Sequence, residues 1–142
     1  MSSPHNYLGF LIADVSRLMR RLFQQRLQNS SLTLAQARAL FYVSRFEGVR
    51  QVDLADALEI QPMTMARLLD QLADNRLIER VPDPRDRRAY QIRLTEAAAP
   101  HLAQIQQVAE QIRDEMLADL NDEQARHFIQ TLDGIRNKLL RC

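Results

Sequence analysis

The sequence contains few residues of the kinds that build small secreted or loop-rich proteins. It has one cysteine, Cys142, no tryptophan, three glycines and five prolines among 142 residues. A single cysteine excludes a disulfide framework and a cysteine-rich zinc knuckle. The scarcity of glycine and proline argues against an all-β fold and favours a mostly helical one. Hydrophobic residues make up 46% of the chain, which suffices for the core of one ordinary domain.

The sequence also lacks the features of a membrane or secreted protein. No apolar run approaches the roughly 18 residues that a membrane-spanning helix needs. The first residues have neither the basic start nor the small-residue cleavage site of a signal peptide. We therefore expect a cytoplasmic protein that does not enter a membrane.

Motifs for catalysis and for cofactor binding are missing as well. The sequence has no glycine-rich phosphate loop, no nucleophile elbow and no metal-binding motif. Its histidines, His5, His101 and His127, are isolated, whereas zinc requires three or four converging ligands. We expect no enzyme activity, no cofactor and no metal site.

The spacing of apolar residues predicts a series of helices interrupted by one hairpin. Three- and four-residue spacing predicts helices over 7–27, from Thr33 to the region of Gly48, over 51–58, 62–74 and 95–119, and from Asn121 onward. The period changes to two at 77–81 and 89–94, which predicts two strands with Tyr90, Ile92 and Leu94 on one face.

Several of the predicted helices have recognisable N-terminal signals. Ser3 followed by Pro4 suits a helix start, and Thr95 is a candidate N-cap. Thr33 with Gln36, and Asn121 with Gln124, have the spacing of reciprocal capping pairs.

The order of these elements predicts a mainly α protein with a small β-hairpin wing, that is, a winged helix-turn-helix. We expect an N-terminal dimerisation helix in 1–32, a DNA-binding winged helix-turn-helix in 33–94 and C-terminal dimerisation helices in 95–142. In such proteins the second short helix enters the major groove of double-stranded DNA. Arginine can contact guanine there, glutamine can contact adenine, and threonine can contact the thymine methyl group. The predicted major-groove residues are Gln61, Met63, Thr64 and Arg67.

The predicted wing concentrates charge in a chain whose formal net charge is only +1. The stretch PDPRDRRAYQIRLT (82–95) contains four arginines and two aspartates. Narrow A·T-rich minor grooves attract arginine, so we expect Arg87 to enter such a groove. Asp86 is expected to hold Arg87 extended through a charge-assisted hydrogen bond. Taken alone, the same charges would also suit an ordinary solvated turn.

At this point the chain resembles the MarR family of bacterial transcription regulators, and in particular its SlyA-like members. The resemblance extends over nearly the whole sequence and is most specific at DPRDRRAYQIRLT, which follows LLDQL. It implies a homodimer that binds pseudo-palindromic operator DNA. It also implies a repressor that a small anionic aromatic effector or an oxidant releases, although the lone C-terminal cysteine makes cysteine-based sensing a poor fit.

The resemblance assigns roles to individual residues by position. Arg67 matches the arginine of the recognition helix, and Asp86 and Arg87 match the aspartate and the arginine of the wing tip. Arg88 matches the neighbour that organises the wing, and Arg85 is expected to face phosphate. The chain departs from the family at Arg76 and Ala98, where relatives often have glycine, which concerns the local turn shapes.

Two features have competing interpretations. The apolar stripes of the first and last two helices suit a dimer interface, because the middle region is too small to cover them all, whereas a monomer core is the alternative. Arg17, Arg20 and Arg21 suit a carboxylate-binding effector pocket, or else a solvated face or phosphate contacts. A protein-binding module on a winged-helix scaffold is the alternative function, and it would not need arginine at both the recognition helix and the wing tip.

Overall fold

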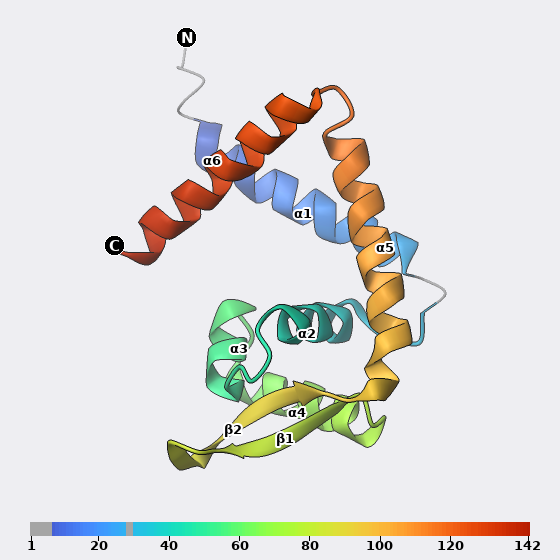
Figure 1. The fold of residues 1–142 in the computed structure, drawn as a ribbon, viewed down its shortest axis with the longest axis vertical. Helices are drawn as coiled ribbons and strands as arrows, with labels where there is room; N and C mark the ends of the chain where they lie inside the picture. Colours follow the sequence, from blue (N-terminus) through green and yellow to red (C-terminus); the bar gives the residue numbers. More distant parts are fainter. Residues whose placement is uncertain (1–6, 28–29) are drawn as a thin grey trace. The chain divides into compact units, whose positions relative to one another are not determined.

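The computed structural model describes residues 7–27 and 30–142 and contains a winged helix (Figure 1). Its elements, in chain order, are α1 (Leu8–Arg26), α2 (Leu34–Arg45), α3 (Gln51–Ala57), α4 (Pro62–Asp74), β1 (Ile78–Asp83), β2 (Asp86–Leu94), the 3-10 turn η2 (Glu96–Ala98), α5 (Ala99–Met116) and α6 (Asp122–Leu140). The chain divides into two compact units, residues 1–109 and 110–142. In the described residues, no helix is both long and apolar enough to cross a membrane.

The predicted helices form at nearly the predicted positions, because their signals are local. The helix predicted over 62–74 spans Pro62–Asp74, with the proline in its first turn. Thr33 and Gln36 form the predicted capping box of α2, and Asn121 and Gln124 form that of α6. In each pair, both side chains accept a backbone N–H that would otherwise lack a partner at the helix start. The predicted N-cap at Ser3–Pro4 lies outside the described residues.

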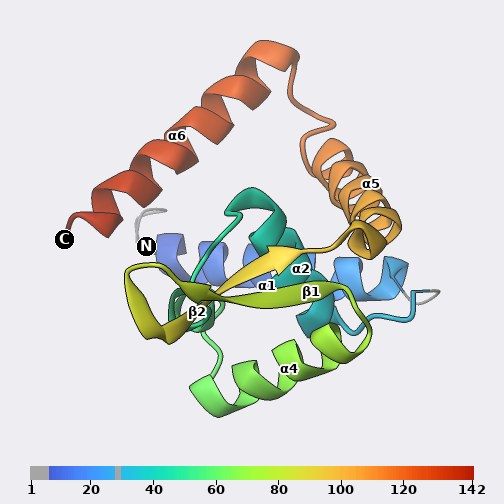
Figure 2. The ribbon, with the colours of Figure 1, turned by 60° about the horizontal axis from the view of Figure 1, so that its bottom comes forward.

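The core of the first unit is built from apolar side chains of α2, α3, α4, the hairpin and α5. Leu40 of α2, Leu54 of α3, Leu69 of α4, Ile92 of β2 and Ile105 of α5 are essentially inaccessible to solvent. Burial of each such side chain contributes about 1.5–3 kcal/mol relative to exposure. This shared core fixes α4 and the hairpin relative to each other (Figure 2).

The hairpin is longer than predicted, and its turn is shorter. β1 and β2 pair antiparallel from Ile78↔Leu94 to Asp83↔Asp86, so that only Pro84 and Arg85 form the turn. The register shifts between Pro82 and Asp83, because Arg87, Arg88 and Ala89 have no partners on β1. Figure 1 shows the hairpin extending past α3 and α4, with its tip clear of both helices. Tyr90, Ile92 and Leu94 were predicted to share one face of the strand, and this prediction holds only in part. Ile92 is buried, but Tyr90 is 47% exposed. Tyr90 pairs with Pro82, next to the register shift.

The segment between α2 and α3 pairs with β2 as a third extended segment, and it supports the hairpin in this way. Arg50 forms an isolated antiparallel bridge with Gln91, and the Ile92 N–H donates to the Val49 carbonyl at 2.8 Å. Gly48, which has a φ of 84°, donates to the Ile92 carbonyl at 3.2 Å. Glycine adopts this left-handed conformation without steric cost, which allows the chain to leave α2 and turn along β2.

Both turns that flank α4 use left-handed residues that are not glycine. After α4, Arg76 has a φ of 61°, its N–H donates to the Ala73 carbonyl, and the Leu77 N–H donates to the Leu72 carbonyl. Glu59 has a φ of 54° in an equivalent turn after α3. Both turns are Schellman motifs, in which glycine is the favoured left-handed residue.

The helix predicted from Thr95 begins later than expected. Thr95 is followed by η2, and α5 starts only at Ala99 and ends at Met116. The Thr95 hydroxyl does not cap a helix; it donates to the Arg76 carbonyl. Ala98 is fully buried in η2. Thr95 therefore joins the end of β2 to the turn after α4.

Two helices keep their apolar stripes exposed in the single chain. No described residue of α1 or α6 is buried. On α1 the exposed apolar residues include Leu8, Leu11, Ile12, Val15, Leu18 and Met19, and on α6 they include Phe128, Ile129, Leu132, Ile135 and Leu139.

Candidate nucleic-acid interface

The outer face of α4 presents the four residues that the sequence assigned to base contacts. Met65, Leu68, Leu69 and Leu72 are buried on one side of α4. The opposite side leaves Gln61, Met63, Thr64 and Arg67 exposed, and Met63 is 73% exposed. Gln61 is the N-cap, but its side chain makes no capping hydrogen bond. The N-terminal half of α4 is therefore free to contact a ligand.

Arg67 has no hydrogen-bond or ion-pair partner among the described residues. Other arginines of the same region do have side-chain partners: Arg50, Arg80, Arg88 and Arg93. An exposed guanidinium without a partner retains all five of its donors. Arg67 can thus make bidentate contacts with a ligand without first breaking an internal hydrogen bond or ion pair.

The wing tip brings together the predicted cluster of arginines. Arg85, Arg87 and Arg88 are all exposed, and the Arg88 side chain is 93% accessible. The side chains of Arg85 and Arg87 have no partner within the described part of the chain. The tip therefore offers two unpaired guanidinium groups at the end of a hairpin.

The predicted brace between Asp86 and Arg87 is wrong. The Asp86 carboxylate accepts from the Arg88 backbone N–H at 3.1 Å and lies 3.5 Å from Arg88 Nε. Adjacent residues of a strand point to opposite faces, so Asp86 shares a face with Arg88 and not with Arg87. Asp83 has a similar role, since its Oδ1 accepts from the Arg85 backbone N–H at 2.8 Å. The two aspartates hold the backbone of the tip, and Arg87 remains free.

Arg50 is a residue of this region that the sequence reasoning missed. Its Nε lies 3.1 Å from Asp83 Oδ2, and its Nη2 lies 3.8 Å from Asp86 Oδ2. Arg50 Nε is buried and does not meet hydrogen-bond geometry with any acceptor in the described residues, so the contact with Asp83 is an ion pair. No spacing rule points to this cluster, because Arg50 precedes the two aspartates by more than thirty residues.

Arg80 is a second missed residue, and it ties the hairpin to both short helices. Its Nη1 lies 2.7 Å from Asp70 Oδ1 of α4, and its Nη2 donates to the Ala66 carbonyl at 3.0 Å. Its Nε donates to Gln51 Oε1 of α3 at 3.2 Å. One half-buried guanidinium therefore sets the position of β1 relative to α3 and α4.

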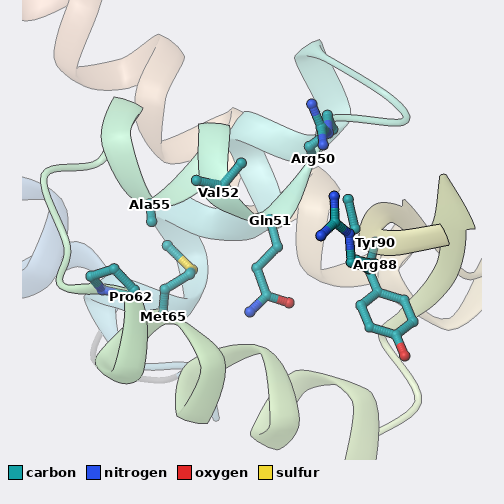
Figure 3. A pocket seen from close by; sticks show the side chains of 9 residues that line it. Arg50, Gln51, Val52, Ala55, Pro62, Met65, Arg88 and Tyr90 are labelled. Atoms are coloured by element: carbon teal, nitrogen blue, oxygen red, sulfur yellow. The ribbon is translucent and has the colours of Figure 1, made fainter. Parts of the chain in front are cut away.

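A hollow of about 250 Å³ lies between α3, the start of α4 and β2 (Figure 3). Val52 and Ala55 line it from α3, Pro62 and Met65 from α4, and Tyr90 from β2. Figure 3 shows Gln51 pointing from α3 toward α4. The hollow is mainly apolar, and Arg50 and Arg88 supply its charge.

The three arginines proposed for an effector pocket lie exposed along α1. Arg17 Nη2 is 3.5 Å from Asp14 Oδ1, and Arg20 Nη1 donates to the Ser16 hydroxyl at 2.7 Å. Arg21 is exposed as well. A role of these residues in effector binding stays a prediction. No group of three or more potential metal ligands occurs within residues 7–27 and 30–142.

Comparison with known proteins agrees with this geometry. A family model described as MarR family matches residues 30–89, which include α2, α3, α4 and β1. The crystal structure of the transcriptional regulator PA3341 is 31% identical, with 96% of this chain and 100% of that chain covered and a TM-score of 0.82. The chain belongs to the MarR family. It is a transcriptional regulator and not an enzyme, as its family is one of transcription regulators.

Two structures described as MarR share the fold over nearly the full length. A MarR transcriptional regulator from Methanosarcina mazei Go1 is 24% identical, with 96% of this chain and 98% of that chain covered and a TM-score of 0.83. A mutant MarR from E. coli complexed with operator DNA is 26% identical, with 98% of this chain and 99% of that chain covered and a TM-score of 0.69. The MarR fold of this chain thus includes the helices on both sides of the winged helix.

Proposed function

We propose that this MarR-family protein binds pseudo-palindromic operator DNA as a homodimer and acts as a repressor. One observation carries the proposal: the recognition helix and the wing tip of the same unit both present exposed arginines that lack internal partners, Arg67 and Arg87. A structural neighbour, the E. coli MarR mutant, is complexed with operator DNA. Internal ion pairs hold the arginines that position the fold, whereas Arg67 and Arg87 remain available for a polyanion.

In the proposed complex, α4 lies in the major groove. Gln61, Met63, Thr64 and Arg67 face the base edges, and arginine is suited to bidentate contacts with guanine O6 and N7. Arg80 keeps α4 fixed against the hairpin, so that the helix and the wing approach the duplex as one body. Such preorganisation lowers the entropic cost of binding.

The wing contacts the neighbouring minor groove through Arg87, in the same complex. Arg85 lies at the turn and is suited to phosphate, while Arg88 and Asp86 organise the tip. Removing Arg87 is expected to weaken binding most where the flanking DNA is A·T-rich, because narrow minor grooves have the strongest negative potential.

Dimerisation is proposed to use the apolar stripes of α1 and α6. These stripes are exposed in the single chain, and large exposed apolar patches mark interaction sites. We assign dimerisation to the regions 1–32 and 95–142, and DNA binding to 33–94. Two recognition helices about one DNA turn apart would read two half-sites, which accounts for a pseudo-palindromic operator.

Release of the repressor by a small anionic aromatic effector completes the proposal. Arg17, Arg20 and Arg21 supply positive charge on α1 that suits a carboxylate. Support for this step comes from the chemistry of these residues and from the family resemblance, and the effector itself remains to be found by screening aromatic acids for loss of DNA binding.

A fluorescence-anisotropy titration tests the DNA interface. The parent protein, Arg87→Ala and the control Arg141→Gln are titrated, each at two salt concentrations, with labelled DNA from upstream of the protein's own gene and with a scrambled duplex. Arg141 is exposed at the end of α6, about 180° around the helix from Leu132 of the apolar stripe, so the control removes the same charge away from both the DNA interface and the proposed dimer interface. We expect tight, salt-sensitive binding by the parent and the control, and weaker binding by Arg87→Ala.

Two results would contradict the proposal. Equal affinity of the parent and Arg87→Ala for an A·T-flanked site would remove Arg87 from the interface. In the second result, the parent binds the upstream DNA no more tightly than the scrambled duplex and its affinity responds little to salt. This result would favour a protein-binding module on this winged-helix scaffold over the proposed regulator of that promoter.

A further inference from the structure

We propose that Arg50 is a positioning residue for DNA recognition, which fixes the wing tip by holding Asp83 and Asp86 together. The inference rests on the proposed function, because its effect on affinity acts through the DNA contacts of the tip. Arg50 lies at the N-cap of α3, outside both the recognition helix and the wing.

The backbone around Arg50 is itself anchored to the hairpin. Arg50 bridges Gln91, and the adjacent Val49 carbonyl accepts from the Ile92 N–H at 2.8 Å. The Arg50 carbonyl also accepts the first intrahelical hydrogen bond of α3, from the Leu54 N–H at 3.0 Å. The guanidinium therefore starts from a fixed point in the helical body and reaches toward the tip.

The two aspartates divide their oxygens between the tip and Arg50. Asp83 uses Oδ1 for the Arg85 N–H and Oδ2 for Arg50. Asp86 uses Oδ1 for the Arg88 N–H and Oδ2 for Arg50. Arg87 lies between the two backbone positions that are held in this way. A single guanidinium thus connects both sides of the turn to the rest of the unit.

Burial makes the contact with Asp83 the more important one. The Asp83 side chain is only 5% exposed, whereas that of Asp86 is 39% exposed. A buried carboxylate without its counter-charge is strongly unfavourable. Without Arg50, we expect Asp83 to turn toward solvent and to release the Arg85 N–H. The tip arginines would then have to be ordered when DNA binds, at a cost in entropy.

Arg50 also affects the charge that the tip presents to DNA. Asp83 and Asp86 would repel phosphate if they were left uncompensated. Arg50 and Arg88 lie within ion-pair distance of these carboxylates, which leaves Arg85 and Arg87 as the unpaired cations. Loss of Arg50 is therefore expected to weaken binding even though Arg50 makes no contact with DNA in this proposal.

A double-mutant cycle between Arg50→Gln and Arg87→Ala tests whether Arg50 acts through the tip. The affinities of the parent, both single variants and the double variant are measured on the operator. We expect each single variant to lose about fivefold or more in affinity, and the double variant to bind within about threefold of Arg87→Ala, because groups that act as a unit are not additive. Arg50→Lys, which keeps the charge but cannot span two carboxylates as arginine does, is expected to fall between the parent and Arg50→Gln.

Additive losses in the cycle would overturn the proposal, because the effect of Arg50 on affinity would then not depend on Arg87 at the tip. An unchanged affinity of Arg50→Gln would overturn it as well. Arg141→Gln serves as the control for loss of one positive charge, and circular dichroism confirms that each variant is folded. If Arg50→Gln does not fold, the cycle is measured with Arg50→Lys in its place, alone and combined with Arg87→Ala.

Amide hydrogen exchange on the free protein separates this inference from the proposed function. We expect the backbone amides of Arg85 and Arg88 to exchange faster in Arg50→Gln than in the parent, with no change at the core amide of Leu69. Unchanged exchange at both tip amides overturns the positioning role, whether or not DNA binds. Failure of the parent to bind any operator overturns the proposed function, and the exchange result then still decides whether Arg50 holds the tip.

Discussion

Arg80 on β1 and Asp70 on α4 form an ion pair in which Nη1 lies 2.7 Å from Oδ1. The two partners differ in their surroundings, since the Arg80 side chain is 23% exposed and that of Asp70 is 61% exposed. Arg80 also donates to Gln51 and to the Ala66 carbonyl. The pair is thus one part of a junction between the wing and the recognition helix, and most of that junction depends on the arginine.

Arg80→Ala is therefore expected to destabilise the protein far more than Asp70→Asn. Loss of Arg80 removes three contacts, and hydrogen bonds to charged groups contribute about 1.5–3 kcal/mol each at most. We expect Arg80→Ala to lower the free energy of unfolding by about 2–3 kcal/mol. Asp70→Asn should cost under about 1 kcal/mol, as exposed ion pairs do. Urea unfolding followed by circular dichroism measures both, and equal losses would contradict this account of the junction.

Arg76→Gly is expected to stabilise the protein. Arg76 is exposed and has a φ of 61° in the Schellman turn after α4. The left-handed conformation costs a non-glycine residue about 1 kcal/mol, which glycine avoids, while glycine adds some unfolded-state entropy. The expected gain is up to about 1 kcal/mol in the free energy of unfolding.

Arg76→Ala is the matched control for this substitution, because alanine loses the same long side chain but retains the Cβ. It should give no gain in urea unfolding. Stabilisation by alanine equal to that by glycine would show that the side chain, and not the backbone conformation, is the unfavourable feature.

Arg67→Ala is expected to reduce both the affinity and the sequence specificity of DNA binding. A bidentate contact with guanine contributes about 1–3 kcal/mol of discrimination. The operator affinity should fall by that amount, and changing the contacted guanine should then have little further effect. Titration of parent and variant against a set of single-base operator variants identifies the position. A uniform loss over all variants would instead assign Arg67 to phosphate.

The elements that the sequence predicted well depend on residues close together in the chain. The spacing within 62–74 and the capping pair Thr33–Gln36 needed no tertiary information. The roles of Arg50 and Arg80 were not predictable in this way, because Arg50 meets Asp83, and Arg80 meets Gln51, only after the chain has folded. Thr95 shows the same limit, since a residue type suited to an N-cap instead donates to the distant Arg76 carbonyl.

The candidate site was predictable to a similar extent. Exposure of Arg67 and of the wing arginines followed from the periods of the helix and the strand. The partner of Asp86 did not follow, because the predicted turn was too long and placed Asp86 and Arg87 outside the strand. Once Asp86 begins β2, the alternation of strand faces selects Arg88 over Arg87.

Leu132→Glu is expected to break the proposed dimer. Leu132 is 44% exposed on the apolar stripe of α6, so a charge there should be tolerated by a monomer. In a dimer that covers this stripe, each unpaired carboxylate would cost several kcal/mol to bury. Gln130→Glu is the matched control, since residue 130 lies about 200° around the helix from residue 132 and the substitution adds the same charge.

Sedimentation velocity should therefore show a dimer for the parent and for Gln130→Glu, and a monomer for Leu132→Glu at the same concentration. Operator affinity should fall together with the dimer, because a single recognition helix reads only one half-site. Circular dichroism should show that the helical content is retained. A folded Leu132→Glu protein that still sediments as the parent does would place the dimer interface elsewhere than on this stripe of α6.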